Sequence, residues 1–462
     1  MGQPVTTSGK KILVPHDLTI KAAGLRMRDG ELTSRELVES CLERIHALEG
    51  SVRAWVEVYE KEALEAARRC DDAFHAERWQ GDLHGIPMGV KDIIHVKGMW
   101  TRYGSSVYPP RLSNTDAPSV KRLKASGAII IGKTETTPLA NNDPAITRNP
   151  WNLKHTPGGS SSGSGAAVAA RMCFAALGTQ TGGSLLRPAA YNGVVGFKPT
   201  YGYISTEGVM PNSWSMDTVG FHTRCVDDAS ILWRAMRETH PVPFARVPTP
   251  SKTTQKEMNE PYPRLGYIRE YFETETAPEV LNNLEYVREK FKAAGAEVVE
   301  LRLPPSFEYV IDGWDTIKFT ELSAFHRPVF ITHHDQFPPK VKDRIEAGLK
   351  IPGYKYVEAL RQRIAFQEEM RECLESVDAA LMPVAYSTAP DGLGSTGSSI
   401  FNRPWTYSGF PAMSIPSGVD QKGLPFAVQL AAQPMAEDRL LAVSAWCESV
   451  MGFDASPVTQ DI

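Results

Sequence analysis

The chain has 462 residues, of which 42% are hydrophobic and 23% are charged, and its formal net charge is −4 at pH 7. This composition is typical of a globular protein, and without a basic excess it argues against binding to nucleic acid or to an anionic membrane. No run approaches the roughly 18 apolar residues that a membrane span needs. The six cysteines are scattered and form no C-x-x-C pair, which favours a reduced, cytoplasmic protein.

Alternating helix and strand patterns run through the first half of the chain. A capping box at Thr33-Ser-Arg-Glu36 precedes apolar residues at helical spacing, which predicts a helix as far as Leu48. The elements expected after it are a strand at 54–59, a helix at 63–78, a strand at 85–94, a helix at 119–126 ending at Gly127, and a strand at 129–131. This alternation favours an α/β layer architecture.

The second half begins with a stretch rich in proline, threonine, serine and lysine, 237–262, which predicts a surface connection. The elements expected after it are a strand at 263–268, a helix at 278–294, a strand at 296–301, and strands around 412–416 and 427–430. Between them, 307–356 is aromatic and irregular; it is a candidate pocket lining, although ordinary helical core is the simpler interpretation. The Gly/Ser-rich segment 392–399 is a second candidate pocket lining.

Two small-residue loops, each carrying serine, are the most informative feature of the sequence. Gly158-Gly-Ser-Ser-Ser-Gly163 is followed, after an alanine-rich helix-like segment, by Gly178-Thr-Gln-Thr-Gly-Gly-Ser184. Such loops can bring hydroxyls and backbone N–H groups to one point, as acyl transfer requires. A phosphate-binding loop is disfavoured, because the Walker pattern needs a lysine after its spacer and the first basic residue after Gly158 is Arg171.

Two interpretations of the serines remain open from the residues alone. Gly159-Ser-Ser-Ser-Gly163 fits the nucleophile elbow G-x-S-x-G with Ser161 at its centre, but no histidine follows His334 to complete an α/β-hydrolase triad. Alternatively, a lysine held neutral by burial activates a serine. Lys91 is the best candidate, since apolar residues flank it on both sides.

The chain resembles the amidase signature hydrolases, and the resemblance spans nearly its whole length. It rests on motifs in family order over about 25–230, with weaker agreement at Ser408-Gly-Phe-Pro and Gly423-Leu-Pro-Phe. The main motifs are Gly85-Ile-Pro-Met-Gly-Val-Lys91-Asp, Gly132-Lys-Thr-Glu-Thr, Arg148-Asn-Pro-Trp-Asn, Thr156-Pro-Gly-Gly-Ser-Ser-Ser-Gly, Gly178-Thr-Gln-Thr-Gly-Gly-Ser and Gly196-Phe-Lys-Pro-Thr-Tyr-Gly.

The resemblance implies an α/β fold in which helices cover both faces of a large twisted mixed β-sheet. A single domain, 1–462, would divide into a signature core at about 25–230, a more variable pocket region at about 240–400, and a return to the core at 405–462. It also implies a triad in which Ser184 is the nucleophile, Ser160 is the bridging serine after a cis peptide bond, and Lys91 is the base. The backbone N–H groups of the oxyanion hole would belong to Thr181, Gly182, Gly183 and Ser184.

The sequence departs from the commonest family pattern at two positions. Gln180 stands where many members have Asp, and Leu186 stands where many have an arginine, which here follows as Arg187. The segment 178–188 is thus similar to the malonamidase-like branch, in which this arginine lies near the substrate. Arg187, Gly159 and Gln180 are therefore candidate substrate-binding residues. For Arg187 the alternatives are a contact with a substrate carboxylate and a structural role on loop carbonyls.

These features predict a hydrolase that cleaves the C–N bond of a small amide, anilide or carbamate through an acyl-enzyme. We expect no metal or organic cofactor, and we expect His333 and His334 to lie at the surface, because no spaced carboxylate completes a metal site with them. We expect a monomer or homodimer with a small-molecule substrate and no nucleic-acid or membrane partner. The alternatives are a protein resembling the amidase-type subunit of a tRNA-dependent amidotransferase, working in a complex, and an esterase that uses Ser161.

Overall fold

A computed structural model describes residues 14–237, 262–274 and 276–457. Its main sheet has 11 strands in the order β1-β5-β2-β6-β8-β7-β12-β13-β11-β9-β10. The strands are β1 (Trp55–Val58), β2 (Pro87–Lys91), β5 (Ile129–Thr134), β6 (Ala175–Gln180), β7 (Val195–Lys198), β8 (Thr218–Thr223), β9 (Arg264–Tyr267), β10 (Glu297–Glu300), β11 (Ala379–Pro383), β12 (Ala412–Val419) and β13 (Pro425–Ala431), with β3 (Trp100–Thr101) and β4 (Arg111–Leu112) as a separate hairpin.

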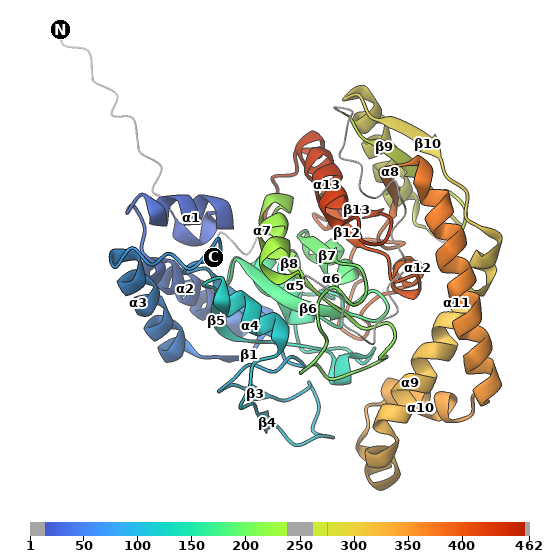
Figure 1. Cartoon of the computed structure of the whole chain (residues 1–462), viewed down its shortest axis with the longest axis horizontal. Coiled ribbons are helices and arrows are strands. Elements are labelled where there is room, and N and C mark those ends of the chain that lie inside the picture. Colours follow the sequence, from blue (N-terminus) through green and yellow to red (C-terminus); the bar gives the residue numbers. More distant parts are fainter. Residues whose placement is uncertain (1–13, 238–261, 275, 458–462) are drawn as a thin grey trace.

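The helices lie on both faces of this sheet (Figure 1). They are α1 (Ile20–Arg28), α2 (Ser34–Val52), α3 (Glu60–His75), α4 (Pro118–Ala125), α5 (Ser162–Ala169), α6 (Leu186–Asn192), α7 (Val226–Met236), α8 (Pro278–Ala293), α9 (Val310–His333), α10 (Pro339–Leu349), α11 (Gly353–Cys373), α12 (Arg403–Tyr407) and α13 (Glu437–Met451). Short 3-10 helices are η1 (Pro15–Asp17), η2 (Pro138–Ala140), η3 (Pro305–Tyr309), η4 (His334–Gln336) and η5 (Leu374–Ser376).

Strand residues alternate between the two faces, and this alternation divides the hydrophobic core. In β5, Ile130 packs with α1, α4 and α7, whereas Ile129 and Ile131 pack with α2, α3 and α5. In β11, Leu381 packs on the side of α8 and α13, whereas Met382 packs on the side of α9, α11 and α12. Helices therefore cover both faces of a mixed sheet, which confirms the predicted fold class.

Several predicted elements are confirmed with small shifts at their ends. The capping box at the start of α2 is present: Glu36 N donates to Thr33 Oγ1 (3.1 Å), and Thr33 N donates to Glu36 Oε2 (2.8 Å). The predicted helix 63–78 is α3, which begins and ends three residues earlier, at Glu60 and His75. The predicted surface connection lies almost wholly outside the described residues.

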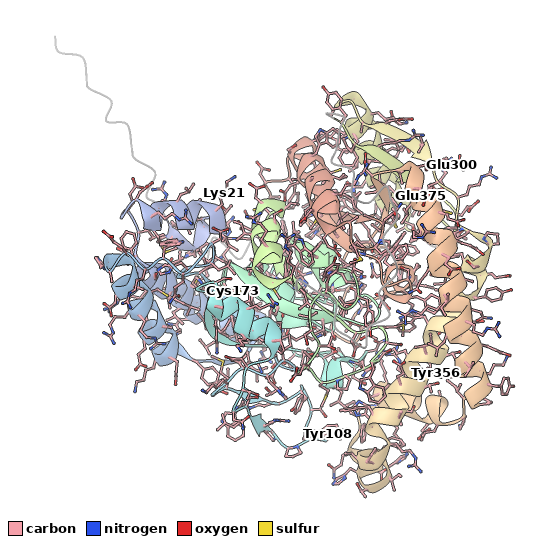
Figure 2. All side chains as sticks on the ribbon, in the orientation of Figure 1. Lys21, Tyr108, Cys173, Glu300, Tyr356 and Glu375 are labelled. Atoms are coloured by element: carbon pink, nitrogen blue, oxygen red, sulfur yellow. The ribbon has the colours of Figure 1, made fainter. Side chains whose placement is uncertain are left out.

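The segment 307–356 is largely helical, in line with the simpler of its two sequence-based interpretations, ordinary helical core, although its sequence pattern is irregular. It contains α9, α10 and the start of α11, which stand together on one side of the molecule in Figure 1. Tyr108, labelled in Figure 2, joins the β3–β4 region to α9 through a hydrogen bond with His326 Nδ1 (2.7 Å).

Among the described helices, none combines the length and apolar character needed to cross a membrane.

Candidate active site

Lys91 is the last residue of β2, which runs parallel to β5 on one side and to β6 on the other. Its side chain is fully buried, and its Nζ donates to Ser160 Oγ (2.6 Å) and to Thr179 Oγ1 (2.8 Å). Thr179 lies near the carboxyl end of β6. The three side chains therefore meet at the carboxyl edge of neighbouring parallel strands, where α/β sheets commonly place their sites.

The charge state of Lys91 follows from this environment. Burial lowers its pKa well below the usual value, and the more distant Asp217 offsets this only in part. Lys133, a buried lysine of the neighbouring strand β5, differs because its Nζ forms an ion pair with the buried Asp92 carboxylate (2.9 Å). Of these two lysines, Lys91 is the one held between hydroxyl groups, and an amine in that position is suited to accept a proton.

The loop of Ser160 is fixed by backbone hydrogen bonds. The peptide bond between Gly159 and Ser160 is cis, and Thr137 N donates to Ser160 O (3.1 Å). Ser161 N donates to Ser184 O (3.3 Å), which ties this loop to the one that carries Ser184. The Ser161 hydroxyl accepts from Thr179 N (3.2 Å) and donates to Thr179 O (3.3 Å). Ser161 thus connects the two loops, and its hydroxyl is occupied by that contact.

The loop from Thr181 to Ser184 has its carbonyl groups directed into the protein. Thr181 O accepts from Trp314 Nε1 (2.8 Å), and Gly182 O accepts from Thr406 Oγ1 (3.0 Å). Gly183 O accepts from Arg187 N (3.0 Å). Because a trans peptide is planar, the N–H that follows each carbonyl points the opposite way. The N–H groups of Gly182, Gly183 and Ser184 therefore each point away from the partner of the preceding carbonyl.

Glycine is required at Gly183 by the close approach of a neighbouring side chain. A Cβ atom at this position would collide with Asn402 Oδ1 and would meet Ser399 Cβ at 2.9 Å. At Gly182 a Cβ would lie 3.0 Å from the Trp314 ring. The two glycines thus let Trp314 of α9 and Asn402, the residue before α12, contact the loop directly.

Asp217 anchors the start of the same loop. Its buried carboxylate accepts from Thr181 Oγ1 (2.5 Å), Asn212 N (2.7 Å) and Ser213 N (3.0 Å). Burial raises the pKa of Asp217 to about 6, and these hydrogen bonds oppose that rise. Thr181 is therefore held at both ends, by Asp217 at its hydroxyl and by Trp314 at its carbonyl.

Thr181→Val is expected to destabilise the protein and slow its reaction. It removes the hydroxyl that donates a hydrogen bond to the buried Asp217 carboxylate. The expected loss in unfolding free energy is about 1.5–3 kcal/mol, the range for hydrogen bonds to charged groups. Because the resemblance implies that 181–184 forms the oxyanion hole, a shift of this loop should also lower kcat by up to about 10²-fold. Chemical denaturation and steady-state kinetics measure both effects. Thr332→Val, an exposed position on α9, is the matched control; equal effects of the two changes would contradict the anchoring role.

Arg187 and Gln180 hold the backbone around the two loops, Arg187 at Gly159 and Gln180 just after Ser184. Arg187 is buried, and its guanidinium donates to Gly159 O, to Gly397 O (2.7 Å) and to Thr396 Oγ1 (3.3 Å). Gln180 Oε1 accepts from Leu185 N (3.0 Å) and Leu186 N (3.1 Å). Arg187 thus links the Ser160 loop to the segment 392–399, and Gln180 closes the turn after Ser184.

Several functional neighbours were missed by sequence reasoning. Thr179, Thr137 and Asp217 contact Lys91, Ser160 and Thr181 respectively, and Trp314 and Thr406 hold the Thr181 and Gly182 carbonyls. Of these five residues, only Thr179 lies inside one of the family motifs, so its place in 178–184 was the one signal in the sequence.

His333 is exposed and the His334 side chain is 43% exposed, with hydrogen bonds to Asp335 and Glu346. Within the described residues no group of His, Cys, Asp and Glu is arranged to hold a metal ion.

Comparisons with known proteins give the family and the fold of the chain. The model of the Amidase family matches residues 36–441. A glutamyl-tRNA(Gln) amidotransferase subunit of Desulfatibacillum aliphaticivorans is 33% identical over 95% of this chain and 98% of its own length. The crystal structure of an amidase superposes with a TM-score of 0.83 at 30% identity, covering 94% of this chain and 99% of that one. The peptide amidase PAM, solved with the competitive inhibitor chymostatin, gives 0.81 at 28% identity over 96% of this chain and 99% of that one.

Proposed function

Because the chain belongs to the Amidase family, we propose that it hydrolyses the C–N bond of a small amide, anilide or carbamate. Ser184 is the nucleophile, Ser160 is the bridging serine and Lys91 is the base. The observation that carries this proposal is the short contact between the buried Lys91 Nζ and Ser160 Oγ (2.6 Å). Burial favours the neutral amine, and the neutral amine is the form of lysine that can accept a proton.

The proposed reaction begins with a proton relay. Neutral Lys91 takes the proton of Ser160, which takes that of Ser184 as the Ser184 oxygen bonds to the substrate carbonyl carbon. Ser160 then returns a proton to the leaving nitrogen as the C–N bond breaks, and Lys91 restores the proton of Ser160. Water attacks the resulting acyl-enzyme through the same relay and releases the acid, so protons balance over the cycle.

The oxyanion of each tetrahedral intermediate is proposed to lie against the loop from Thr181 to Ser184. The orientation of the N–H groups of Gly182, Gly183 and Ser184, away from the partners of the preceding carbonyls, supports this assignment. Such preorganised donors contribute to catalysis because they stabilise charge only as it develops. For Arg187, Gly159 and Gln180 we propose that they shape the substrate pocket by holding its loops, since their polar groups bond mainly to loop backbone.

A panel of amides, anilides, carbamates and esters, assayed with the purified chain alone, tests this proposal. We expect hydrolysis of at least one C–N substrate without a second protein, a nucleotide or tRNA. Added hydroxylamine should divert part of the product to the acyl hydroxamate, because it competes with water for an acyl-enzyme. Turnover without any hydroxamate would contradict the covalent mechanism, and a complete lack of turnover would contradict the proposed function.

A second candidate function is supported by the relatives named as subunits of glutamyl-tRNA(Gln) amidotransferase, one of which covers 95% of this chain. In that case the chain would work in a complex. Size-exclusion chromatography of the protein purified from its own cell extract separates the two candidates. A monomer or homodimer that retains amidase activity favours the first. Activity that appears only in a heteromeric complex favours the second.

A further inference from the structure

A cavity of about 550 Å³ opens beside α9, apart from the residues of the candidate active site. Its walls come from the segment 103–111 of the β3–β4 hairpin, from the segment 208–211 before β8, and from α9. The lining residues that matter below are Tyr103, Tyr108, Arg111, Met210 and Phe325, and we call the cavity that they bound the aromatic pocket. None of its lining residues belongs to the proposed triad or to the oxyanion loop.

Three aromatic rings form one wall of this pocket. The rings of Tyr108 and Phe325 are nearly parallel, with an interplanar angle of 27° and centroids 6.4 Å apart. Tyr103 meets Tyr108 edge-on at 6.2 Å, and the Tyr108 hydroxyl is fixed by its hydrogen bond with His326 Nδ1 (2.7 Å). Aromatic rings pack favourably against other rings in such stacked or edge-on arrangements, and the flexible Met210 side chain adapts to a ring edge. The wall is therefore suited to a flat aromatic ligand.

One cation stands at the rim of the aromatic pocket without an acidic partner. Arg111 is exposed, and it forms no ion pair with the residues that the structure describes. Burial, and then the charges of Arg111 and Lys133, lower the pKa of the lining His95 to about 4, so its imidazole is neutral at pH 7. The acidic side chains of the neighbouring segments each pair with another cation: Asp92 with Lys133 (2.9 Å), Asp116 with Lys124 (2.8 Å) and Glu57 with Arg102 (2.6 Å). The pocket therefore carries one net positive charge, and none of its lining residues is acidic.

The backbone of the pocket leads directly to the candidate active site. Met210 N donates to Ile93 O (3.0 Å), and Ile93 follows Lys91 by two residues. On the other side, Asn212 follows Met210 by two residues, and its N–H donates to the Asp217 carboxylate (2.7 Å), which anchors the oxyanion loop. A ligand in the pocket would therefore contact the segments that position the base and the oxyanion loop without touching either group.

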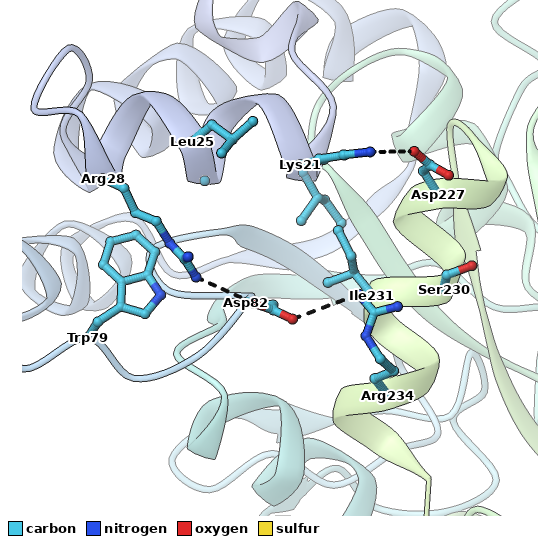
Figure 3. A pocket seen from close by; sticks show the side chains of 11 residues that line it. Lys21, Leu25, Arg28, Trp79, Asp82, Asp227, Ser230, Ile231 and Arg234 are labelled. Carbon is cyan, nitrogen blue, oxygen red and sulfur yellow. Dashed lines mark hydrogen bonds and ion pairs between the residues drawn. The ribbon is translucent and has the colours of Figure 1, made fainter.

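A smaller pocket elsewhere in the molecule has a different character. A cavity of about 270 Å³ lies between α1 and α7 and carries charged residues of both signs (Figure 3). Its acids pair with its bases: Asp82 lies 3.5 Å from Arg28 and 3.8 Å from Arg234, and Asp227 lies 3.0 Å from Lys21. The charges of that pocket are thus satisfied within it, whereas the cation of the aromatic pocket has no acidic partner among the described residues.

We propose that the aromatic pocket is a second binding site, separate from the site of the reaction, and that it takes a small aromatic acid, in which a flat ring carries a carboxylate. The ring packs against Tyr108 and Phe325, and the carboxylate pairs with the planar guanidinium of Arg111 at the rim. The cavity volume lies within the range of about 300–1,000 Å³ that is usual for small-molecule sites. Because Arg111 is exposed, the ring supplies most of the affinity and the charge sets the preference for an acid.

Isothermal titration calorimetry on the full chain tests this inference. The probe is 3-phenylpropionate; 3-phenylpropan-1-ol is its uncharged counterpart, and 3-cyclohexylpropionate is an acid of similar size without the aromatic ring. We expect the probe to bind about threefold more tightly than the alcohol, as an exposed ion pair allows. It should bind about fivefold more tightly than the cyclohexyl acid, as contacts between aromatic rings allow. Equal binding of the three compounds, or no binding of the probe, would overturn the inference.

Variants of the pocket separate the two contributions. Arg111→Gln should remove the preference for the acid over the alcohol, and Phe325→Leu should reduce the preference for the aromatic acid over the cyclohexyl acid. The matched controls are Arg361→Gln and Tyr354→Leu, at exposed positions of α11, and both should retain the two preferences. Thermal unfolding curves check that each variant is folded. If folded Arg111→Gln and Phe325→Leu proteins bind all three compounds as the wild type does, the probe lies elsewhere and the proposed site is wrong.

Photolabelling locates the bound acid directly. The aromatic acid 4-benzoylbenzoate carries a ketone that, when excited by light, inserts into nearby C–H bonds, and peptide mass mapping identifies the labelled residues. We expect the label on Met210 or on another residue of the aromatic pocket, and excess 3-phenylpropionate should suppress it. Labelling confined to the peptides that carry Lys91, Ser160 or Ser184 would overturn the inference. Absence of amide hydrolysis in every assay, by contrast, would contradict the proposed function and leave this second site unaffected.

Discussion

Ser184→Ala is expected to abolish amide hydrolysis and leave the protein folded. In the proposed mechanism the substitution removes the atom that bonds to the substrate carbonyl, and removal of the nucleophile from a serine hydrolase costs on the order of 10⁶-fold in kcat. Ser184 is only partly buried, so the loss of its hydroxyl leaves no deep cavity. Progress curves at high enzyme concentration and a thermal unfolding curve measure the two halves of this prediction.

Two further serine variants make the result specific. Ser51→Ala alters an exposed residue of α2 and should retain wild-type kinetics. Ser161→Ala should slow the reaction while leaving an acyl-enzyme detectable by mass spectrometry, because Ser161 positions the loops and is not acylated in the proposed mechanism. An acyl adduct on Ser161, or substantial turnover by Ser184→Ala, would instead favour the nucleophile-elbow alternative.

The loops of the site were predictable because their residues lie close together in sequence. The glycines and serines of 158–163 and 178–184 indicate backbone that must approach other groups closely. Lys91 was harder to assign, since its partners Ser160 and Thr179 are 69 and 88 residues away. Spacing along the chain does not encode such a contact, and Lys91 was assigned through its apolar flanks and the family resemblance.

Helix α9 shows why the sequence pattern of 307–356 is irregular even though helical core was its simpler interpretation. Its buried stripe recurs at helical spacing, but Lys318, Glu321, Ser323 and His326 occupy positions on it. A pattern of apolar residues alone is broken at each of these positions, although the period is intact. Their polar atoms bond to groups from other parts of the chain, including Asn141 and Ser213. The polar residues that interrupt the apolar pattern of α9 are therefore the same residues that connect this helix to the site.

Asp217 illustrates a second limit of sequence reasoning. It belongs to none of the family motifs, and its role arises only because the turn before β8 brings its carboxylate to Thr181. Burial of a carboxylate is costly unless donors surround it, and these donors are one hydroxyl and two backbone N–H groups. Backbone donors carry no sequence signal, so the anchoring of the oxyanion loop could be recognised only in the folded structure.

Lys91→Met is expected to abolish activity and to stabilise the protein at the same time. Methionine matches lysine in unbranched shape but cannot accept a proton. In the proposed relay no group would then take the proton that passes from Ser184 to Ser160. We expect a loss in kcat/KM of about 10⁴-fold or more, as for other catalytic units that depend on a base. Lys91→Arg should be equally inactive, because a guanidinium remains protonated.

The stability gain has a definite dependence on pH. Burial holds the folded-state pKa of Lys91 below the unfolded-state value of 10.5. Between these two values the unfolded chain binds more protons than the folded one, so wild-type stability rises with pH. The advantage of Lys91→Met in Tm should therefore be largest at low pH and should shrink as pH approaches 10.5. Lys61→Met, at an exposed site on α3, should show no such trend.

The wild-type rate should follow the same ionisation. kcat/KM should rise with pH through the depressed pKa of Lys91, because only the neutral amine accepts a proton. The double variant Lys91→Met/Ser184→Ala then tests whether the residues act together. If one proton relay connects them, the double variant should be no slower than either single variant, since either change alone already stops the relay. Additive losses would mean that Lys91 and Ser184 contribute independently, and the proposed triad would have to be abandoned.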